Sequence, residues 1–375
     1  MSGRSDHTVV EVGSGGPHGA YPVLIGEGLL DALPRLLGEL APAHRYAIVS
    51  DAHVAELYGR SALAHCRDAG VRADLFTFPR GEASKTREHW SLLTDRLLES
   101  GLGRDAAVVA LGGGVTGDLA GFVAATYMRG LPLVQVPTSL LAMIDASVGG
   151  KTGVDVKAGK NLVGAFHAPR AVIVDPRVLA TLEPAERAQG LAEALKHGAV
   201  ADRRYFDRLA ESAVALLAAD TEAVTEAVRR SVEVKAEIVG ADEREQGRRQ
   251  VLNFGHTLGH ALEAASGYAL GHGYAVAAGM VLEARLGEAM GVTESGTADT
   301  LLDTLGRFGL GTLPPGTGET RSVTSFLSHD KKARTGRARY VLLERIGSCR
   351  SRGGWSHPVP PELVDEVLAS ALGAR

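Results

Sequence analysis

The feature that most constrains the fold is an alternation of short apolar runs with helical stretches in the first half of the chain. Runs rich in β-branched or other apolar residues occupy positions 45–51, 74–78, 106–111, 133–137 and 171–175, and a helical pattern fills positions 85–100. Strands that alternate with helices of this length predict a parallel sheet with helices on its faces. We therefore expect an α/β domain over residues 1–180.

The pattern changes after about residue 180. Helical periodicity marks positions 184–200, 203–218, 221–239, 257–265 and 276–290, and strand-like residues return only at 340–343. A chain of 375 residues is also too long for one compact core. The sequence predicts a second, mainly α-helical domain over residues 181–375.

Charge and composition exclude several classes of partner. The net charge of −4 gives no reason to expect nucleic acid or an anionic membrane as partner. The most apolar region, residues 106–126, is interrupted by glycines and Asp118, unlike a membrane span. The N-terminal residues lack the apolar stretch of a signal peptide, and Cys66 and Cys349 fit a reducing compartment, although their spacing leaves a single disulfide open. We expect a cytoplasmic protein.

A glycine-rich loop follows one of the expected strands. Gly112, Gly114 and Gly117 satisfy the pattern G-x-G-x-x-G directly after the run at 106–111 and before a helical stretch. Such glycines let backbone N–H groups approach a pyrophosphate at a helix N-terminus. The loop alone fits a packed strand–helix turn equally well, and no acid follows about twenty residues downstream as in the usual dinucleotide fingerprint. Asp51, which ends an earlier strand, is the alternative acid for the ribose hydroxyls.

Three histidines indicate a metal site. His256 and His260 are four residues apart and would share one face of a helix, and His272 follows in a glycine-rich segment. Zinc in enzymes commonly takes three protein ligands and keeps a fourth position for substrate. The spacing does not choose between the pair His256 and His260 and the pair His256 and His272, and it does not supply the third ligand.

Charged residues also interrupt apolar or glycine-rich stretches elsewhere. Taken singly, most of them fit ordinary solvated side chains, but Lys151 and Lys160 both lie among glycines. Gathered around one pocket, such cations would bind phosphate and carboxylate groups. The set comprises Arg129, Asp145, Lys151, Lys160, Lys196, Lys235, Arg249, Lys331 and Lys332.

Several motifs together carry a resemblance to a known family over nearly the whole chain. They are GGGVTGD (112–118), YMRG (127–130), QVPTSLL (135–141), DASVGGK (145–151), GKN (159–161), AEALK (192–196), DERE (242–245), LNFGHTLGH (252–260) and HDKK (329–332). In this order they resemble the 3-dehydroquinate synthase family of sugar-phosphate cyclases. The resemblance implies an α/β N-terminal Rossmann-like NAD-binding domain with a mainly α-helical C-terminal metal-binding domain.

The resemblance also implies roles for individual residues. Zinc, or cobalt in its place, would be held by Glu193, His256 and His272, with His260 on the substrate side of the metal or in its outer shell. NAD would be bound by Asp51, Glu82, Lys85, Gly113, Gly114, Val115, Asp118, Thr138, Ser139, Lys160 and Thr181. The substrate phosphate would be bound by Lys151, Asn161, Arg129 and a lysine of the pair Lys331 and Lys332, with Arg129 reaching across a homodimer interface. The carboxylate would be bound by Lys235 and Arg249, and the ring hydroxyls by Asp145, Lys196 and Asn253.

The implied reaction belongs to the shikimate pathway of aromatic amino acid biosynthesis. A phosphate-eliminating lyase of this kind converts 3-deoxy-D-arabino-heptulosonate 7-phosphate to 3-dehydroquinate and phosphate. The resemblance implies transient oxidation by NAD, phosphate elimination, re-reduction and an intramolecular aldol closure. The expected partner is therefore a small sugar phosphate.

Alternative reactions remain open at this point. His53, Ala185 and Tyr274 depart from the commonest family pattern, which leaves an amino analogue of the substrate, or another sugar phosphate, possible. A metal-dependent polyol or alcohol dehydrogenase is a second hypothesis, against which the cations Lys151, Lys235 and Arg249 argue. An NAD-binding regulatory protein is a third, against which the complete set of expected metal ligands argues.

Overall fold

The computed structural model describes residues 7–13, 19–157, 159–311, 320–327 and 338–373. The chain divides into two compact units: the first comprises Met1–Leu182 and Val224–Gly240, and the second Glu183–Ala223 and Ala241–Arg375. The segment Val224–Gly240, which the sequence placed in the second domain, groups with the first unit. It forms most of helix α9 (Thr221–Ala241), and Lys235 of this helix is bonded to Asp145 of the first unit.

The first unit is built on a seven-stranded sheet in the order β1-β2-β9-β6-β5-β3-β4. All neighbouring strands are parallel except β1 and β2, which are antiparallel. A parallel sheet is covered on both faces, and its strands are therefore apolar throughout; β5 is buried at every residue. The predicted α/β sheet is confirmed, whereas the pair β1 and β2 was not predicted. The strands are β1 (Thr8–Val12), β2 (Tyr21–Ile25), β3 (Arg45–Asp51), β4 (Ala73–Phe78), β5 (Ala106–Gly112), β6 (Leu133–Pro137) and β9 (Ala171–Val174).

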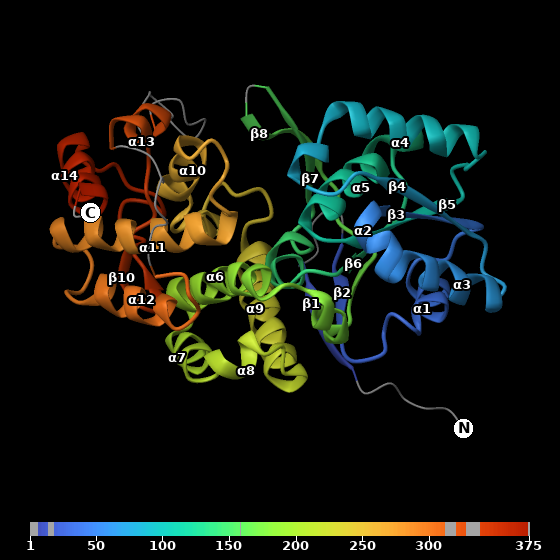
Figure 1. Cartoon of the computed structure of the whole chain (residues 1–375), viewed down its shortest axis with the longest axis horizontal. Helices are drawn as coiled ribbons and strands as arrows, with labels where there is room; N and C mark the ends of the chain where they lie inside the picture. The colour runs from blue at the N-terminus through green and yellow to red at the C-terminus, as the bar shows by residue number, and fades with distance from the viewer. Residues whose placement is uncertain (1–6, 14–18, 158, 312–319, 328–337, 374–375) are drawn as a thin grey trace. The chain divides into compact units, whose positions relative to one another are not determined.

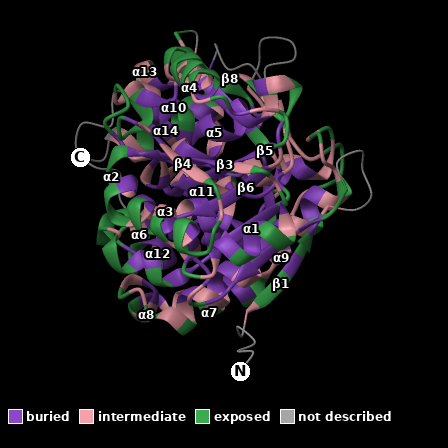
Figure 2. Ribbon diagram, turned by 90° about the vertical axis from the view of Figure 1, so that its right-hand side faces the viewer, coloured by how far each residue is buried: buried purple, intermediate pink, exposed green. Residues whose placement is uncertain are grey.

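Helices cover both faces of this sheet. In Figure 1, α4 and α5 lie on one side of the strands and α1 and α3 on the other. Leu93 and Leu97 of α4 and Leu119 and Val123 of α5 pack in one buried cluster with β3, β4 and β5. Figure 2 shows β3, β5 and β6 almost entirely in the colour of buried residues. The helical segments are α1 (Leu33–Leu40), α2 (Ala52–Val54), η1 (Ala55–Gly59), α3 (Arg60–Asp68), η2 (Glu82–Ser84), α4 (Arg87–Glu99), α5 (Gly114–Thr126), η3 (Tyr127–Arg129), η4 (Ala142–Ala146) and η5 (Pro176–Thr181).

The strand order creates a topological switch point between β3 and β5. The chain passes from β3 to β4 on one side of β3 and then crosses to β5 on the other side. Ligands of open α/β sheets bind at such a point, beyond the carboxyl ends of the strands. Asp51 ends β3 and Gly112 ends β5, so the two sequence features expected to bind a dinucleotide flank the switch point.

A separate hairpin, β7 (Lys151–Val156) and β8 (Gly159–Phe166), was not predicted from the sequence. Its glycines and lysines hid the alternation typical of a strand. Gly153 and Gly164 are paired across the hairpin, and a Cβ on Gly164 would lie 2.1 Å from the carbonyl oxygen of Thr152. The close backbone approach explains the glycine, and the hairpin carries Lys151, Lys160 and Asn161.

The second unit is mainly helical, as predicted. The predicted helix at 203–218 is divided into two, and the one predicted from residue 276 begins earlier, at His272, because Gly271 in extended conformation caps it. The predicted strand at 340–343 reduces to a bridge between Tyr340 and His357 before a short strand from Leu343. Its elements are α6 (Pro184–Ala201), α7 (Arg203–Glu211), α8 (Ala213–Leu217), η6 (Arg248–Asn253), α10 (His256–Ala265), α11 (His272–Ala289), α12 (Thr297–Gly306), α13 (Thr320–Leu327), β10 (Leu343–Arg345), β11 (Ser348–Cys349) and α14 (Pro361–Gly373).

Two sequence expectations concern the chain as a whole. Within the described residues, no helix combines the length and the apolar character that crossing a membrane would require. Cys66 and Cys349 are both free, so the disulfide left open by the sequence is not formed. Lys331 and Lys332 lie outside the described residues.

Candidate active site

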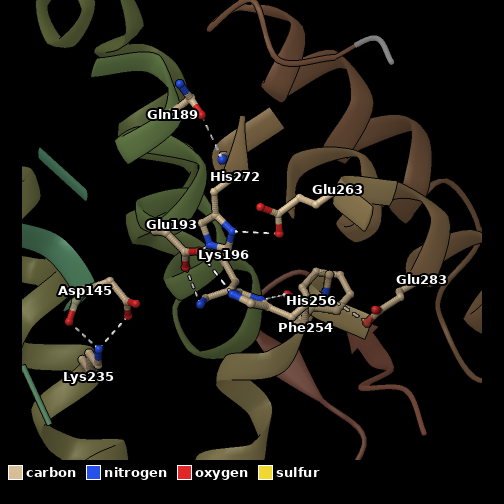
Figure 3. Close-up of polar contacts among 12 residues, drawn as sticks. Asp145, Gln189, Glu193, Lys196, Lys235, Phe254, His256, Glu263, His272 and Glu283 are labelled. Atoms are coloured by element: carbon tan, nitrogen blue, oxygen red, sulfur yellow. Dashed lines mark hydrogen bonds and ion pairs between the residues drawn. The ribbon is translucent and has the colours of Figure 1, made fainter. Parts of the chain in front are cut away.

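Three helices of the second unit bring one carboxylate and two imidazoles together. Glu193 lies in the middle of α6, while His256 and His272 are the first residues of α10 and α11 (Figure 3). Oε1 of Glu193 lies 3.4 Å from Nε2 of His256 and 3.5 Å from Nε2 of His272. Ligands placed about 2.1 Å from a tetrahedral zinc ion are about 3.4 Å from one another. The spacing therefore fits a zinc ion between the three atoms.

The second nitrogen of each imidazole faces an acceptor. Nδ1 of His256 donates to the carbonyl oxygen of Phe254 at 3.2 Å, and Nδ1 of His272 donates to Oε2 of Glu263 at 3.3 Å. Because a carbonyl oxygen can only accept, the proton of neutral His256 lies on Nδ1 and the lone pair on Nε2. Such outer contacts fix the tautomer and orientation of metal-binding histidines. Both rings thus present Nε2 toward Glu193.

The electrostatics of Glu193 also favour a cation. Its side chain is completely buried, and neither oxygen accepts a hydrogen bond of regular geometry among the described residues, although Lys196 forms an ion pair with it. Burial alone would raise the pKa of Glu193, but the nearby Lys196 ammonium holds this pKa well below its usual range. A buried carboxylate needs compensating positive charge, so the donor set fits a divalent metal.

The two histidines differ in their affinity for protons. Burial and the nearby Lys196 ammonium lower the pKa of His256, which keeps its ring neutral. Burial would also lower the pKa of His272, but its contacts with Glu193 and Glu263 raise that pKa to about 9. A metal ion at this position therefore has to displace a proton from His272.

A second group of possible ligands overlaps the first. Suitable atoms of His260, Glu263 and His272 also lie within 4.8 Å of one another. The sequence had left open the pair His256 and His260, and these two form no such group within the described residues. Of these two overlapping groups, the first combines a fully buried carboxylate with two imidazole nitrogens already oriented toward it, so it is the better metal site.

Other candidate residues of the second unit belong to η6 and α10. Arg249 is almost completely buried, and its guanidinium donates to the carbonyl oxygen of Glu243 at 2.6 Å. Asn253 donates to the side chain of Glu245. His260 lies one helical turn after His256, with its ring edge-on to that of His256. Arg249 and Asn253 are thus held in place by other residues of the chain.

In the first unit, the glycine loop opens helix α5. Cβ atoms added at Gly112 and Gly117 would lie 2.3 Å from Oγ1 of Thr116 and 2.9 Å from Oε1 of Gln135, so packing excludes side chains at both positions. The loop is therefore in part a packed strand–helix turn.

Gly113 and Gly114 have more space around them than Gly112 and Gly117. Cβ atoms at Gly113 and Gly114 would meet their nearest neighbours, Oγ of Ser139 and Cβ of Ala146, at 3.3 and 3.4 Å. Gly113 is the N-cap of α5, and no side chain caps the helix. Bare amides at a helix N-terminus, at the end of a parallel strand, bind phosphate groups. Gly113, Gly114 and Val115 are thus placed to meet a pyrophosphate.

Residues from neighbouring strand ends surround this loop. Thr138 and Ser139 follow β6, and the amide of Thr138 donates to the carbonyl oxygen of Gly112 at 2.9 Å. Asp51 uses only Oδ1 to cap α2, where it accepts from the amides of His53 and Val54 at 2.9 and 3.1 Å. Thr181 ends η5, and its hydroxyl lies 2.7 Å from that of Tyr58.

Four residues expected at the nucleotide form one charged cluster with Asp155. Nζ of Lys85 lies 3.0 Å from Glu82, 3.2 Å from Asp118 and 3.8 Å from Asp155, and Lys160 lies 4.0 Å from Glu82. Burial raises the pKa of Asp118 to about 6 despite the opposing effect of Lys85. Burial would lower the pKa of Lys85, but Asp118 and Glu82 raise it above its usual range.

The candidate substrate residues of the first unit fall into two groups. Nζ of Lys235 donates to Oδ1 and to the backbone oxygen of Asp145, at 2.7 and 2.5 Å, which fixes this ammonium (Figure 3). Lys151 and Arg129 are exposed, and Asn161 has a φ of +55° with its amide bonded to Asp155. Among the described residues of this unit, the candidate cations do not gather in one cluster.

A cavity of about 570 Å³ lies at the opposite edge of the sheet. It is lined by residues at the amino ends of β3, β4 and β5, among them Arg45, Arg72 and Asp105. None of the candidate site residues lines it, and its arginines are in part paired, as Arg45 is with Asp74. It contributes nothing to the site.

Several residues with a structural part in the site were not predicted. Glu263 and the carbonyl of Phe254 orient the imidazoles, and Asp155 completes the charged cluster. Glu263 stands seven residues after His256 and three after His260, a spacing that places it on a neighbouring face of the same helix. That spacing was a usable signal. Asp155 gave none, because its role depends on the missed hairpin.

Comparison with known proteins places the chain in a family. The model of the 3-dehydroquinate synthase N-terminal domain matches residues 75–189, and that of the C-terminal domain matches residues 190–333. A 3-dehydroquinate synthase of Caulobacter vibrioides is 48% identical over 335 residues, covering 88% of this chain and 90% of the relative.

Solved structures agree with this placement. The 2-epi-5-epi-valiolone synthase of Streptomyces hygroscopicus, solved with NAD⁺ and Zn²⁺ bound, is 30% identical with a TM-score of 0.86, and the match covers 96% of this chain and 99% of that one. A 2-deoxy-scyllo-inosose synthase complexed with carbaglucose-6-phosphate, NAD⁺ and Co²⁺ has a TM-score of 0.90 over 97% of this chain and 100% of that one; at 24% identity it shows the fold alone. With its two domain matches, its close relatives and a buried zinc-type ligand set, the chain belongs to the 3-dehydroquinate synthase family.

Proposed function

We propose that this protein is a 3-dehydroquinate synthase, which converts 3-deoxy-D-arabino-heptulosonate 7-phosphate to 3-dehydroquinate and phosphate with NAD and a divalent metal, zinc or cobalt. The observation that carries the proposal is the convergence of Glu193, His256 and His272 at zinc spacing in a chain about half identical to 3-dehydroquinate synthases. This reaction places the protein in the shikimate pathway.

The metal and the nucleotide have separate residues to hold them. Glu193, His256 and His272 hold the metal, and His260 lies beside them for the substrate. Gly113, Gly114 and Val115 receive the pyrophosphate of NAD, and Asp51 receives the ribose hydroxyls with Oδ2, since its cap uses Oδ1. When bound, the metal polarises substrate oxygens and NAD takes up and returns a hydride.

The remaining residues proposed for NAD binding surround the nucleotide with charged and polar side chains. Lys85 balances the carboxylates of Glu82 and Asp118, which keeps this acidic cluster compatible with an anionic nucleotide nearby. The other residues proposed to surround the nucleotide are Thr138, Ser139, Lys160 and Thr181.

The substrate anions are assigned to the cations of the chain. Lys235, fixed by Asp145, and the buried Arg249 bind the carboxylate, because fixed cations position a substrate with little loss of entropy. Lys196 and Asn253, together with Asp145, contact the ring hydroxyls. The phosphate is bound by Lys151, Asn161, Arg129 and a lysine of the pair Lys331 and Lys332.

We also propose that the enzyme acts as a cytoplasmic homodimer in which Arg129 serves the phosphate site of the partner. Arg129 is exposed and has a φ of +73°, in a turn that directs it away from the core of its own unit. Mixing the inactive variants Arg129→Ala and Lys151→Ala tests this arrangement. If Arg129 acts in the partner's site, each heterodimer has one intact site, and an equal mixture should recover about a quarter of the wild-type activity. If no activity is recovered, the shared site is excluded.

The reaction is tested by measuring phosphate release from 3-deoxy-D-arabino-heptulosonate 7-phosphate, with NAD and zinc, while the absorbance of NADH is followed. We expect release without accumulation of NADH, abolished by chelation and restored by zinc or cobalt. Stoichiometric NADH would identify a dehydrogenase instead. No turnover with this substrate, but turnover with its amino analogue, would identify an amino-dehydroquinate synthase.

A further inference from the structure

A further carboxylate, that of Glu283, lies against the N-terminus of α10 and has no part in the roles above. It belongs to α11, is completely buried, and accepts two backbone hydrogen bonds. Oε2 accepts from the amide of Gly255 at 2.9 Å, and Oε1 accepts from the amide of Leu258 at 3.3 Å. Both donors belong to the N-terminus of α10, the helix that begins with His256.

These two amides are the ones that a capping box satisfies. In that motif, the N-cap side chain accepts from the third residue of the helix, and the side chain of that residue accepts from the N-cap amide. Here the N-cap is Gly255, which has no side chain, and the third residue is Leu258, which has no acceptor. Glu283 satisfies both amides from the neighbouring helix.

The packing of α10 on α11 explains why the cap comes from a distance. Gly255 has a φ of +78°, and a Cβ there would lie 2.6 Å from Cγ of Met280 and 2.8 Å from the carbonyl oxygen of Val276. A Cβ on Gly279 would lie 1.9 Å from the carbonyl oxygen of Gly255. The two backbones are therefore in contact, and no capping side chain fits at position 255.

The hydrogen bond from Gly255 has a consequence for the metal ligand. Its N–H group belongs to the same planar peptide as the carbonyl of Phe254, and this carbonyl accepts from Nδ1 of His256 at 3.2 Å. A continuous path thus runs from the carboxylate of Glu283 through one peptide group to the imidazole (Figure 3). Hydrogen bonds in such a chain polarise one another, so the carboxylate strengthens the carbonyl as an acceptor.

We propose that Glu283 is a positioning residue of the metal centre, which orients the imidazole of His256 through the Phe254–Gly255 peptide. The inference rests on the metal site of the proposed function but not on the reaction catalysed. Outer partners of metal-binding histidines typically change metal affinity by about 10- to 100-fold. Because Glu283 acts through a peptide, we expect the lower end of that range.

The same helix offers a matched control. Glu288 of α11 accepts from the amide of Ala298 at 2.9 Å and so caps α12, whose N-cap is also a glycine with positive φ, Gly296. Helix α12 carries none of the candidate site residues. The variants Glu283→Gln and Glu288→Gln therefore both remove a carboxylate that caps a helix from α11, but only the first lies on the path to His256.

The experiment measures zinc affinity of the metal-free full-length variants by competition with a chromophoric chelator, together with Tm and the visible spectrum of the cobalt form. We expect Glu283→Gln to weaken zinc binding about tenfold and to alter the cobalt spectrum, and Glu288→Gln to lower Tm without changing either. The proposal would be overturned if Glu283→Gln bound zinc as tightly as the wild type, or if both variants lost zinc affinity to the same extent. If Glu283→Gln does not fold, Glu283→Asp keeps the charge but draws the carboxylate back from the amide of Gly255 by one methylene group. Zinc affinity should then still fall, and an unchanged affinity would refute the role. No substrate is used, so neither result bears on the identity of the reaction.

Discussion

Oε2 of Glu263 lies 3.3 Å from Nδ1 of His272, while Nε2 of the same ring lies 3.5 Å from Oε1 of Glu193. One imidazole is thus held between two carboxylates, and its pKa is raised to about 9 in spite of burial. In the presence of a metal at Nε2, the proton on Nδ1 remains bonded to Glu263. The pair of Glu263 and His272 therefore sets both the orientation of the ligand and the proton that has to leave.

Replacing Glu263 by glutamine should weaken the metal site without removing a ligand. The amide can still accept at one atom but carries no charge, so His272 becomes a less basic ligand. We expect zinc affinity to fall by about 10- to 100-fold, and phosphate release to recover when zinc is added in excess. Equilibrium dialysis against zinc measures the change. Unaltered affinity would mean that Glu263 does not support the ligand.

Replacing Glu193 by glutamine should remove the metal site itself. The variant loses the only anionic member of the ligand set and removes the carboxylate that forms an ion pair with the buried Lys196. We therefore expect the amount of bound zinc and the rate of phosphate release each to fall by at least about 100-fold. The matched control is Glu186→Gln, in the exposed first turn of the same helix. Metal analysis of the purified proteins checks this, and full zinc occupancy in Glu193→Gln would reject the ligand set.

The parts of the fold that depend on local pattern were predictable from the sequence. Strands such as β6 and helices such as α6 occur at or within a residue of their expected bounds, because a buried parallel strand and an amphipathic helix each impose their own periodicity. The hairpin β7–β8 was missed because Gly153 and Gly164 are required by backbone contact across the strands, and such contacts leave no periodic signal.

In the site, too, local sequence patterns were predictable and contacts between distant segments were not. The spacing of His256, His260 and His272 indicated a metal but did not select the ligands. Selection depends on Glu193, which lies on a helix far away in sequence, and on the contacts of each Nδ1. Resemblance to a family supplied this ligand set, and the geometry supplies its physical reason. Glu283 could not be found from sequence, because its partners are backbone amides of another helix.

Replacing Gly114 by alanine should separate binding of NAD from stability. Gly114 is the first residue of α5, and an added Cβ meets only Cβ of Ala146, at the ordinary distance of 3.4 Å, so the fold should tolerate it. If the amides of residues 113–115 bind the pyrophosphate as proposed, a methyl group added at this position should hinder its close approach, and we expect the Kd for NAD to rise about tenfold or more.

The control for this variant is Gly38→Ala in α1, where an added Cβ meets nothing within 4 Å. Alanine in a helix interior is favoured over glycine by about 0.5–1 kcal/mol, so this control should raise Tm and leave NAD binding unchanged. Calorimetric titration with NAD measures the Kd of both variants, and thermal unfolding measures their Tm. An unchanged Kd in Gly114→Ala would place the nucleotide elsewhere.

The raised pKa of Asp118 predicts a pH dependence of stability. Its folded-state pKa of about 6 lies above the ordinary aspartate value of 3.8, so between these values the folded protein binds more protons at this site than the unfolded chain does. The contribution of Asp118 to stability is therefore present at low pH and is lost as pH rises from about 4 to about 6. Above pH 6 both states are ionised, and the cost, on the order of 2–3 kcal/mol, stays constant.

Asp118→Asn removes this titration and leaves Lys85 with Glu82 and Asp155 as partners. The free energy of unfolding of the variant, relative to that of the wild type, should therefore increase between pH 4 and pH 7, as measured by urea unfolding at each pH. Asp95→Asn, at an exposed position of α4, controls for the loss of a carboxylate, and its difference from the wild type should not follow this course. A difference for Asp118→Asn that is constant across this range, or that changes in the opposite direction, would show that Asp118 is ionised in the folded protein throughout, and that Lys85 outweighs its burial.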